Sequence, residues 1–192
     1  MESVTRGYGF LENFLSKQRT RIANELMPHI KREKILDIGC GTVPYFLIQA
    51  DFKERHGIDP NAKNKTYNGI HLHRNNIKNG GILPFPSNNF DVVTMLAVVE
   101  HLDPKSVTKL LSETKRVLKP NGRLIITTPT PASDSILKLM ASLGVVSKIE
   151  IEDHKLLYSR EVLINCMNNA GFKEMRFGHF EFFLNSWAYA DK

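Results

Sequence analysis

A short apolar stretch that runs directly into a glycine loop constrains the fold of this chain more than any other feature. Residues 35–46 read ILDIGCGTVPYF, in which Gly39 and Gly41 follow a predicted buried strand. Glycine adopts backbone conformations that other residues avoid, and its missing side chain lets a ligand approach the main chain closely. Pro44 suits the first position of a helix, where no backbone donor is needed. The sequence therefore predicts a strand, a bare turn and the start of a helix, in that order.

Predicted strands and helices alternate along the central part of the chain. Strands are expected at 34–39, 54–60, 69–75, 90–99 and 123–130, and helices within 10–30, ending near Pro28, and at 45–50 and 104–118. Such alternation is typical of a parallel sheet with helices on both faces. The remaining chain predicts helices at 134–147 and 160–169, followed by two strands within 173–190. We therefore expect an α/β fold with an open, doubly wound, mostly parallel seven-stranded sheet, helices on both faces and an antiparallel edge hairpin at the C-terminus.

Composition excludes several classes of protein. No apolar run approaches the ~20 residues of a membrane-spanning helix, and the start, MESVTRGYGFLENFL, lacks the features of a signal peptide. The two cysteines, Cys40 and Cys166, are far apart, which favours a reducing, cytoplasmic location over a disulfide framework. The net charge of +6 comes from scattered basic residues with acids among them, so we expect no dedicated nucleic-acid surface.

Two carboxylates accompany the glycine loop. Asp59 follows Gly39 by twenty residues, at the end of the second predicted strand, where an acid can accept two hydrogen bonds from a ribose diol. A dinucleotide-binding G-x-G-x-x-G loop would have its third glycine at the position of Pro44. Asp37 lies two residues before Gly39; a carboxylate there would repel a pyrophosphate and attract an ammonium group. These residues favour a nucleoside with an amino-acid tail, with a nicotinamide-dependent oxidoreductase as the alternative.

Five segments together resemble the class I S-adenosylmethionine-dependent methyltransferases. ILDIGCGT and HGIDP are similar to the first two motifs of that family. Residues 83–93, 98–104 and 113–129 resemble the approach to its fourth strand, the segment directly after that strand, and its next helix, turn and fifth strand. Residues 154–172 resemble the last helix of its small-molecule branch, so the likeness is close over 34–130 and loose beyond. The resemblance implies a Rossmann-like methyltransferase fold, S-adenosyl-L-methionine as cofactor and S-adenosyl-L-homocysteine as product.

The resemblance also assigns a cofactor site by position. Its residues are Asp37, Gly39, Cys40, Gly41, Thr42, Asp59, Pro60, Asn76, Ile77, Leu96 and Ala97. The first five would line the methionine part, the next two the ribose and adenine, Asn76 and Ile77 the adenine edge, and the last two the transferred methyl. Asn76 replaces an acidic residue that is usual in the family, and Val43 replaces a common third glycine.

The acceptor side offers three catalytic candidates. His101, beside Glu100, follows the fourth predicted strand at its ligand end and is the best candidate base for a hydroxyl acceptor. His154 follows an acidic stretch and is the second candidate. Relatives that methylate quinone-precursor hydroxyls carry a Glu-x-x-Glu-His metal cluster here; Ala97 replaces its first glutamate, so we expect no metal. His71 and His73 share one strand face without an evident third ligand and are interpreted as surface or packing residues.

The most economical interpretation is a single methyltransferase domain over 1–192, with a helical segment 1–33, a cofactor-binding core 34–130 and substrate-side helices and a hairpin at 131–192. We expect transfer of a methyl group to a small-molecule or glycan acceptor, at a hydroxyl rather than at nitrogen or carbon. The predicted helix 134–147 could cover the acceptor, contact a membrane peripherally or pair with a second subunit, and the chain is expected to be a monomer or homodimer. An inactive cofactor-binding partner subunit is the alternative outside catalysis.

Overall fold

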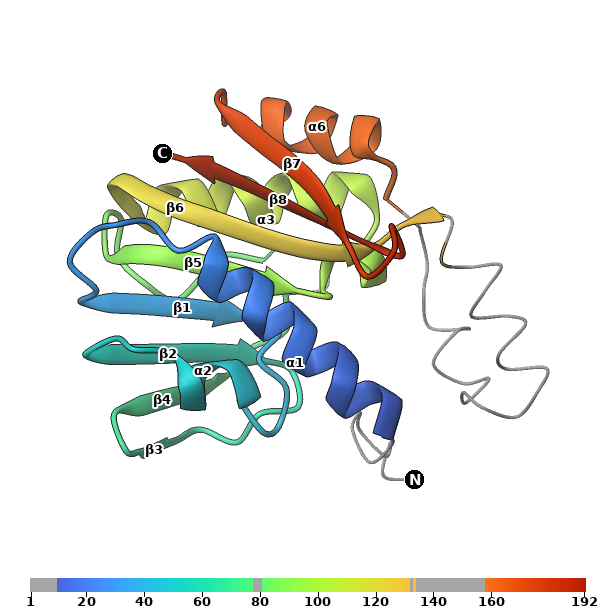
Figure 1. Ribbon diagram of the computed structural model, residues 1–192. Helices are drawn as coiled ribbons and strands as arrows, with labels where there is room; N and C mark the ends of the chain where they lie inside the picture. The colour runs from blue at the N-terminus through green and yellow to red at the C-terminus, as the bar shows by residue number, and fades with distance from the viewer. Residues whose placement is uncertain (1–9, 78–80, 132, 134–157) are drawn as a thin grey trace.

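A computed structural model describes residues 10–77, 81–131, 133 and 158–192 (Figure 1). Its strands are β1 Lys34–Ile38, β2 Glu54–Asp59, β3 Lys65–Tyr67, β4 Ile70–Arg74, β5 Phe90–Leu96, β6 Leu118–Pro129, β7 Met175–Phe180 and β8 Asn185–Asp191. Its helices are α1 Phe10–Glu25, α2 Tyr45–Gln49, the 3-10 turn η1 Val99–His101, α3 Pro104–Val117 and α6 Arg160–Asn169. The predicted helix 134–147 and His154 lie outside the described residues.

All the strands belong to one sheet, in the order β3-β4-β2-β1-β5-β6-β8-β7. β1 pairs in parallel with β2 and β5, β2 with β4, and β5 with β6, which confirms the predicted parallel core. The chain adds β2 and then β4 on one side of β1, and afterwards adds β5 and β6 on the opposite side of β1. Ligands of open α/β sheets bind beyond the carboxyl ends of the strands at such a reversal of strand order. The glycine loop follows β1 at this point.

Over the described residues the sheet has eight strands, one more than the sequence predicted. The additional strand is β3, which pairs antiparallel with β4 at one edge. Asn68 and Gly69 connect the two strands with backbone φ angles of 47° and 72°. A two-residue Asn-Gly loop with both φ angles positive matches the right-handed twist of a hairpin. This dipeptide is a signal for a hairpin, and our prediction of a single strand at 69–75 overlooked it.

The C-terminal hairpin is antiparallel, as predicted, with β8 inserted between β6 and β7. Gly178 lies opposite Trp187 across the hairpin, and a Cβ atom at Gly178 would lie 2.3 Å from Cζ2 of the indole. A glycine at this position therefore lets the tryptophan ring lie flat across β7.

The helices cover both faces of the sheet, as expected (Figure 1). α3 and α6 bury Leu110, Leu111 and Met167 against one face, together with Leu36 and Ile126 from the strands. α1 and α2 cover the other face in a second apolar cluster. No described helix is long and apolar enough to cross a membrane.

Three predicted boundaries were wrong. The strand predicted at 90–99 ends at Leu96, and residue 99 already belongs to η1. α1 ends at Glu25, three residues before Pro28, at which the sequence suggested a stop. β6 begins at Leu118, not at residue 123, because the chain joins the sheet directly after α3 and turns at Asn121, whose φ is 62°. Asn tolerates this left-handed conformation better than most residues.

Candidate functional site

The glycine loop has the backbone that its composition predicts. Gly39 and Gly41 have φ angles of +80° and +73°, which favour glycine. The Gly39 N–H donates to the Ile58 carbonyl at 2.7 Å, which ties the loop to the end of β2. A Cβ atom at Gly39 would lie 2.4 Å from Cγ2 of Val98, so the loop packs directly on the start of η1. A Cβ at Gly41 would have only the Val43 carbonyl oxygen within 4 Å, at 3.8 Å, so open space lies beside this glycine.

Asp59, the last residue of β2, faces this loop. Its carboxylate accepts the Gly41 N–H at 3.1 Å and the Asn61 N–H at 2.8 Å, and the residue is 6% exposed. A carboxylate has about four lone-pair sites. Two backbone donors therefore orient the group and leave capacity for two further donors, such as the hydroxyls of a ribose.

Asp37 lies in β1 beside Asp59 and is buried. The Thr94 hydroxyl, from β5, donates to Asp37 Oδ1 at 2.7 Å. The Asp37 pKa is raised from 3.8 to about 7: burial is the main cause, the Thr94 hydrogen bond opposes the rise, and the nearby charge of Asp59 adds to it. Since no basic group is among these influences, a cation placed here would stabilise the ionised form. The site thus suits an ammonium group.

The rest of the predicted methionine and ribose side surrounds these two acids. Cys40 is buried and packs against Gly57, and burial raises the pKa of its thiol well above the ordinary value. A thiol with a raised pKa is a poor nucleophile. Thr42 is exposed, and Pro60 is half-buried directly after Asp59.

The predicted adenine and methyl positions are placed at the same edge of the sheet. Asn76 is exposed just beyond β4, whereas Ile77 is 5% exposed and packs into the core. Leu96 ends β5 and is half-buried. Ala97 follows with a φ of 57°, and its N–H donates to the Thr127 carbonyl at 3.0 Å. A left-handed backbone conformation at a non-glycine residue is uncommon and costs energy. The hydrogen bond to Thr127 of β6 helps to hold Ala97 in this conformation.

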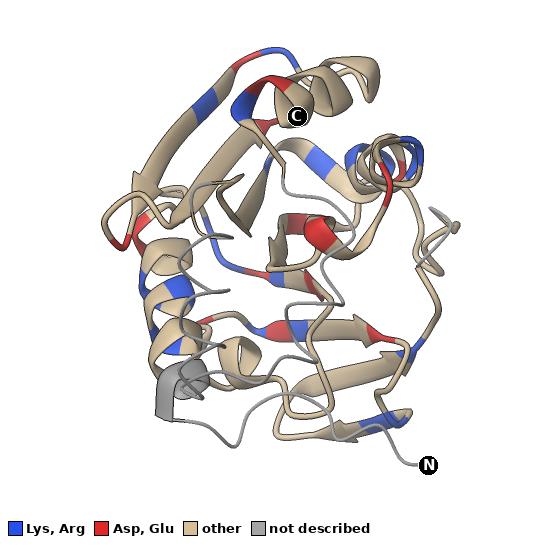
Figure 2. Ribbon diagram, turned by 90° about the vertical axis from the view of Figure 1, so that its right-hand side faces the viewer, with Lys and Arg blue, Asp and Glu red and all other residues tan. Residues whose placement is uncertain are grey.

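Two of the three catalytic candidates lie in η1, directly beyond β5 (Figure 2 looks onto this edge of the sheet). Glu100 is 1% exposed, and the Thr128 hydroxyl donates to its Oε2 at 3.3 Å. His101 is half-buried, and its backbone N–H donates to the Val98 carbonyl at 3.1 Å. The placement of His154 is not described.

Sequence reasoning missed two residues of this site, Thr94 and Thr128. Each is buried and hydrogen-bonded to a predicted site carboxylate, Asp37 and Glu100 respectively. A hydroxyl within an otherwise apolar central strand was the available signal, because a buried polar group needs a partner.

Three histidines of β2 and β4 form a cluster away from the glycine loop. His56 of β2 stacks on His71 and His73 of β4, with ring centroids 4.8 and 5.5 Å apart. His56 Nδ1 lies 3.2 Å from His73 Nε2, within hydrogen-bond distance. Among the residues that the structure describes, no group of three or more His, Cys, Asp or Glu side chains could hold a metal ion.

Comparisons with known proteins agree on one family. Residues 9–175 match the methyltransferase domain family. A probable S-adenosylmethionine-dependent methyltransferase of Mycolicibacterium smegmatis is 28% identical over 121 residues, which are 62% of this chain and 46% of that protein. The ubiquinone/menaquinone biosynthesis C-methyltransferase UbiE of Saccharophagus degradans is 23% identical over 171 residues, covering 80% of this chain and 56% of that protein. The chain thus spans about half the length of these curated relatives.

Solved structures agree on the fold. The crystal structure of an S-adenosylmethionine-dependent methyltransferase from Mesorhizobium loti superposes with a TM-score of 0.70 at 16% identity, covering 93% of this chain and all of that one. The chain therefore belongs to the methyltransferase domain family and has the Rossmann-like fold of the class I S-adenosylmethionine-dependent methyltransferases.

Proposed function

We propose that this chain is an active methyltransferase that transfers the methyl group of S-adenosylmethionine to a small-molecule or glycan acceptor. The observation that carries the proposal is the pair of buried acids at the glycine loop: Asp59, oriented by two backbone donors, and Asp37, whose pKa is raised by burial beside it. In this proposal residues 34–130 bind the cofactor and 131–192 contribute to the acceptor side.

Each acid has a distinct task. Asp59 accepts hydrogen bonds from the ribose hydroxyls. Because it also accepts the Gly41 N–H, it links the position of the sugar to that of the glycine loop. Asp37 attracts the ammonium of the methionine tail, directly or through water. The open space beside Gly41 leaves room for the tail, and Leu96 and Ala97 lie beneath the methyl group.

The reaction is an in-line displacement. A lone pair of the acceptor forms a bond to the methyl carbon while the carbon–sulfur bond breaks and its electron pair returns to sulfur, which leaves neutral. Alignment contributes up to ~7–11 kcal/mol in favourable cases. For a hydroxyl acceptor the proton leaves to a base, and His101 beside Glu100 is the residue that we propose for that role. A positioned base contributes typically ~10²–10⁴ in rate.

Carbon is the second candidate acceptor atom. Its support is the similarity to UbiE, which is named a C-methyltransferase. A carbon nucleophile also loses a proton, so Glu100 and His101 would serve it equally well.

The test is mass spectrometry of metabolites incubated with the enzyme and an isotopically labelled methyl donor. A labelled product supports the proposal, and its fragmentation identifies the methylated atom. His101→Ala should then lower turnover while leaving affinity for S-adenosylhomocysteine unchanged; turnover at the wild-type level would remove His101 as the base.

Two results would overturn the proposal. Binding of NADH without binding of S-adenosylhomocysteine would indicate the oxidoreductase alternative. Affinity for S-adenosylhomocysteine without turnover across a broad acceptor panel, together with a copurifying protein, would indicate an inactive partner subunit. Cytoplasmic location and the monomeric or homodimeric state stay predictions.

A further inference from the structure

A row of polar side chains crosses the sheet at the carboxyl end of β6. Thr128 of β6 lies opposite Ser186 of β8, and Ser186 lies opposite His179 of β7. The Ser186 hydroxyl is 3.2 Å from His179 Nδ1, within hydrogen-bond distance. One step earlier along β6, Ile126 on the same face belongs to the apolar core. The face that α6 covers therefore changes from apolar to polar where the parallel strands end.

This row lines a cavity of about 110 Å³ between the sheet and α6. Tyr158 and Leu163 form apolar walls of the cavity. The Tyr158 hydroxyl donates to the Leu102 carbonyl at 2.9 Å, so its proton is not available to a ligand. Drug-sized ligands occupy pockets of ~300–1,000 Å³. A cavity of this volume holds a few atoms of an acceptor, about the size of one carboxylate or phosphate group.

Among the described residues that line this cavity, the one with a full charge is Arg160, the first residue of α6. Its guanidinium carbon lies 5.5 Å from the centre of the Phe177 ring. Within the described part of the chain, no carboxylate forms an ion pair with Arg160. A guanidinium stacked on an aromatic ring keeps its N–H groups available for a planar anion.

The opposite end of the row leads to the proposed catalytic residues. Thr128 donates to Glu100, which adjoins His101 in η1. Neighbouring strands are ~4.8 Å apart, so two strand spacings place His179 about 10 Å from Thr128.

We propose that the cavity formed by Thr128, Ser186, His179 and Arg160 binds an anionic group of the methyl acceptor, either a carboxylate or a phosphate. The cavity holds the anionic group, and the rest of the acceptor extends past Thr128 toward His101. This inference rests on the proposed methyltransferase function and narrows its substrate class to small acidic molecules.

Binding is tested first without knowledge of the acceptor. The protein, saturated with S-adenosylhomocysteine, is titrated with inorganic phosphate and separately with acetate, and the backbone amides of Gly178 and His179 are followed by NMR. At least one anion should produce saturable shifts, and Arg160→Gln should weaken that binding at least tenfold. The anion that binds more tightly distinguishes a phosphate from a carboxylate acceptor.

The matched control is Arg176→Gln, on the opposite face of β7, where the backbone of Arg176 pairs with that of Tyr189. It should leave the anion shifts unchanged. Absence of saturable shifts in the wild type, or equal affinity in Arg160→Gln, would overturn the proposal.

Turnover provides the second arm. Acceptors found by the labelled-methyl screen should carry a carboxylate or phosphate, and Arg160→Gln should raise KM at least tenfold with kcat within about twofold. Methylation of an uncharged acceptor with unaltered KM in Arg160→Gln would reject the anionic subsite and leave the methyltransferase function intact. Failure of the wild type to bind S-adenosylhomocysteine would instead reject the function.

Discussion

Asp59 joins the second strand to the glycine loop, because one carboxylate oxygen accepts the Gly41 N–H while the other accepts the Asn61 N–H directly after the strand. Its replacement by Asn keeps the size of the side chain and one acceptor oxygen but removes the charge. A charge-assisted hydrogen bond is worth about 1.5–3 kcal/mol. Asp59→Asn should therefore weaken the binding of S-adenosylhomocysteine more than about tenfold, as measured by calorimetry.

The control for this prediction is Asp51→Asn, an exposed acid close by in the sequence, which should bind like the wild type. Thermal unfolding of both variants separates lost affinity from lost structure. Unchanged affinity in a folded Asp59→Asn protein would contradict the ribose role.

Asp37 makes cofactor affinity depend on pH. Its pKa is raised, mainly by burial, to about 7, so at pH 6 the Asp37 carboxyl group of the free protein is mostly protonated. Binding of an ammonium group beside it favours the ionised carboxylate, and the proton is released. If binding lowers the pKa well below 6, proton linkage predicts that affinity for S-adenosylhomocysteine rises about tenfold from pH 6 to pH 8. Calorimetry in buffers of different ionisation enthalpy should detect proton release, and Asp37→Asn should abolish both effects.

The same pKa has a consequence for stability. Below about pH 4 the carboxyl group is neutral in both the folded and the unfolded chain. Above that pH the unfolded chain ionises first, because its pKa is near 3.8, while the folded chain keeps its proton until about pH 7. The stabilisation that the protonated Asp37 carboxyl group gives the folded chain is thus complete below about pH 4. It declines as the pH rises from there and is lost once the pH has passed through about 7. A cofactor that neutralises the ionised group would offset this loss.

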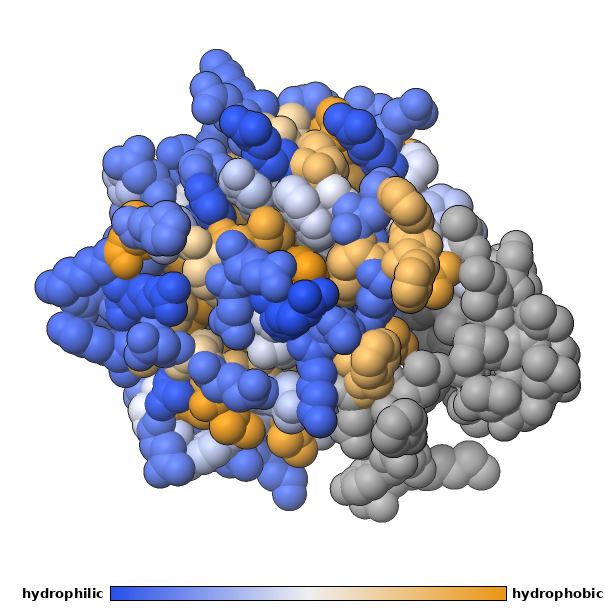
Figure 3. Space-filling model, in the orientation of Figure 1, coloured by the Kyte–Doolittle hydropathy of each residue, from blue (hydrophilic) through white to orange (hydrophobic). Residues whose placement is uncertain are grey.

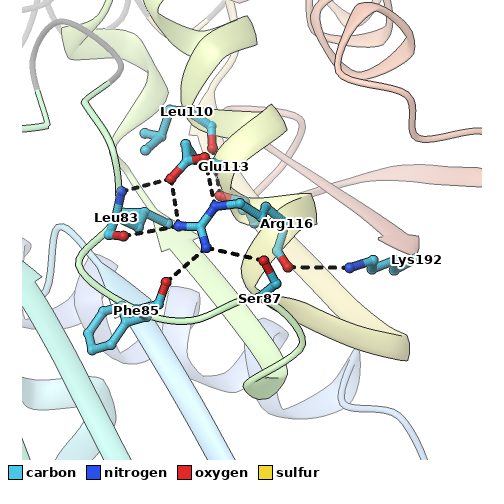
Figure 4. A network of polar contacts seen from close by, with 8 residues as sticks. Leu83, Phe85, Ser87, Leu110, Glu113, Arg116 and Lys192 are labelled. Carbon is cyan, nitrogen blue, oxygen red and sulfur yellow. Dashed lines mark hydrogen bonds and ion pairs between the residues drawn. The ribbon is translucent and has the colours of Figure 1, made fainter.

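At the scale of elements, residues 83–87, which lead into β5, are held by side chains of α3 and lie in no helix or strand (Figure 4). Arg116 donates to the Leu83 carbonyl at 3.0 Å and to the Phe85 carbonyl at 2.8 Å. Glu113 pairs with Arg116 at 2.8 Å and accepts the Leu83 N–H at 2.9 Å. The Glu113–Arg116 pair thus satisfies backbone N–H and carbonyl groups that have no partners within a helix or strand.

Arg116→Met should therefore destabilise the protein by about 1–3 kcal/mol, since two carbonyls lose their donor and Glu113 loses its partner. Urea unfolding measures the difference. Arg21→Met is the matched control, because Arg21 pairs with Glu25 on the exposed surface of α1 and such pairs contribute little. Equal stability of the two variants would show that the segment does not depend on α3.

At the scale of the whole molecule, the C-terminal hairpin completes the sheet. β8 pairs with β6 from Arg123↔Asp191 to Pro129↔Asn185, and its Ala188 and Ala190 are fully buried. Figure 3 shows a largely hydrophilic face over α1, with apolar side chains gathered toward the end of the molecule where the parallel strands finish. Removal of the hairpin would expose the edge of β6 together with part of the core.

A chain that ends at Phe172 should lose cooperative thermal unfolding and aggregate, because an uncovered strand edge pairs with other chains. Circular dichroism and size-exclusion chromatography check this. Phe182→Ser, at the tip of the same hairpin, should behave like the wild type, since Phe182 is 97% exposed. A monomeric, cooperatively folded truncation would show that β6 tolerates a free edge.

The sequence by itself determined the glycine loop, the parallel core and the family. These depend on local patterns: apolar strands, residues with special backbone freedom, and an acid at a set distance along the chain. The resemblance extended this to the positions of the cofactor residues, whose roles stay predictions. The Asn68–Gly69 hairpin was equally local and could have been predicted.

The tertiary structure alone decided which distant residues meet. Thr94 reaches Asp37 and Thr128 reaches Glu100 because neighbouring strands in the sheet come from separate parts of the chain. The cavity beside Arg160 needs α6, β6, β7 and β8 in their final places. Side-chain alternation fixes the face on which a residue lies, but the strand order and register fix its neighbours, and these depend on packing of the whole sheet.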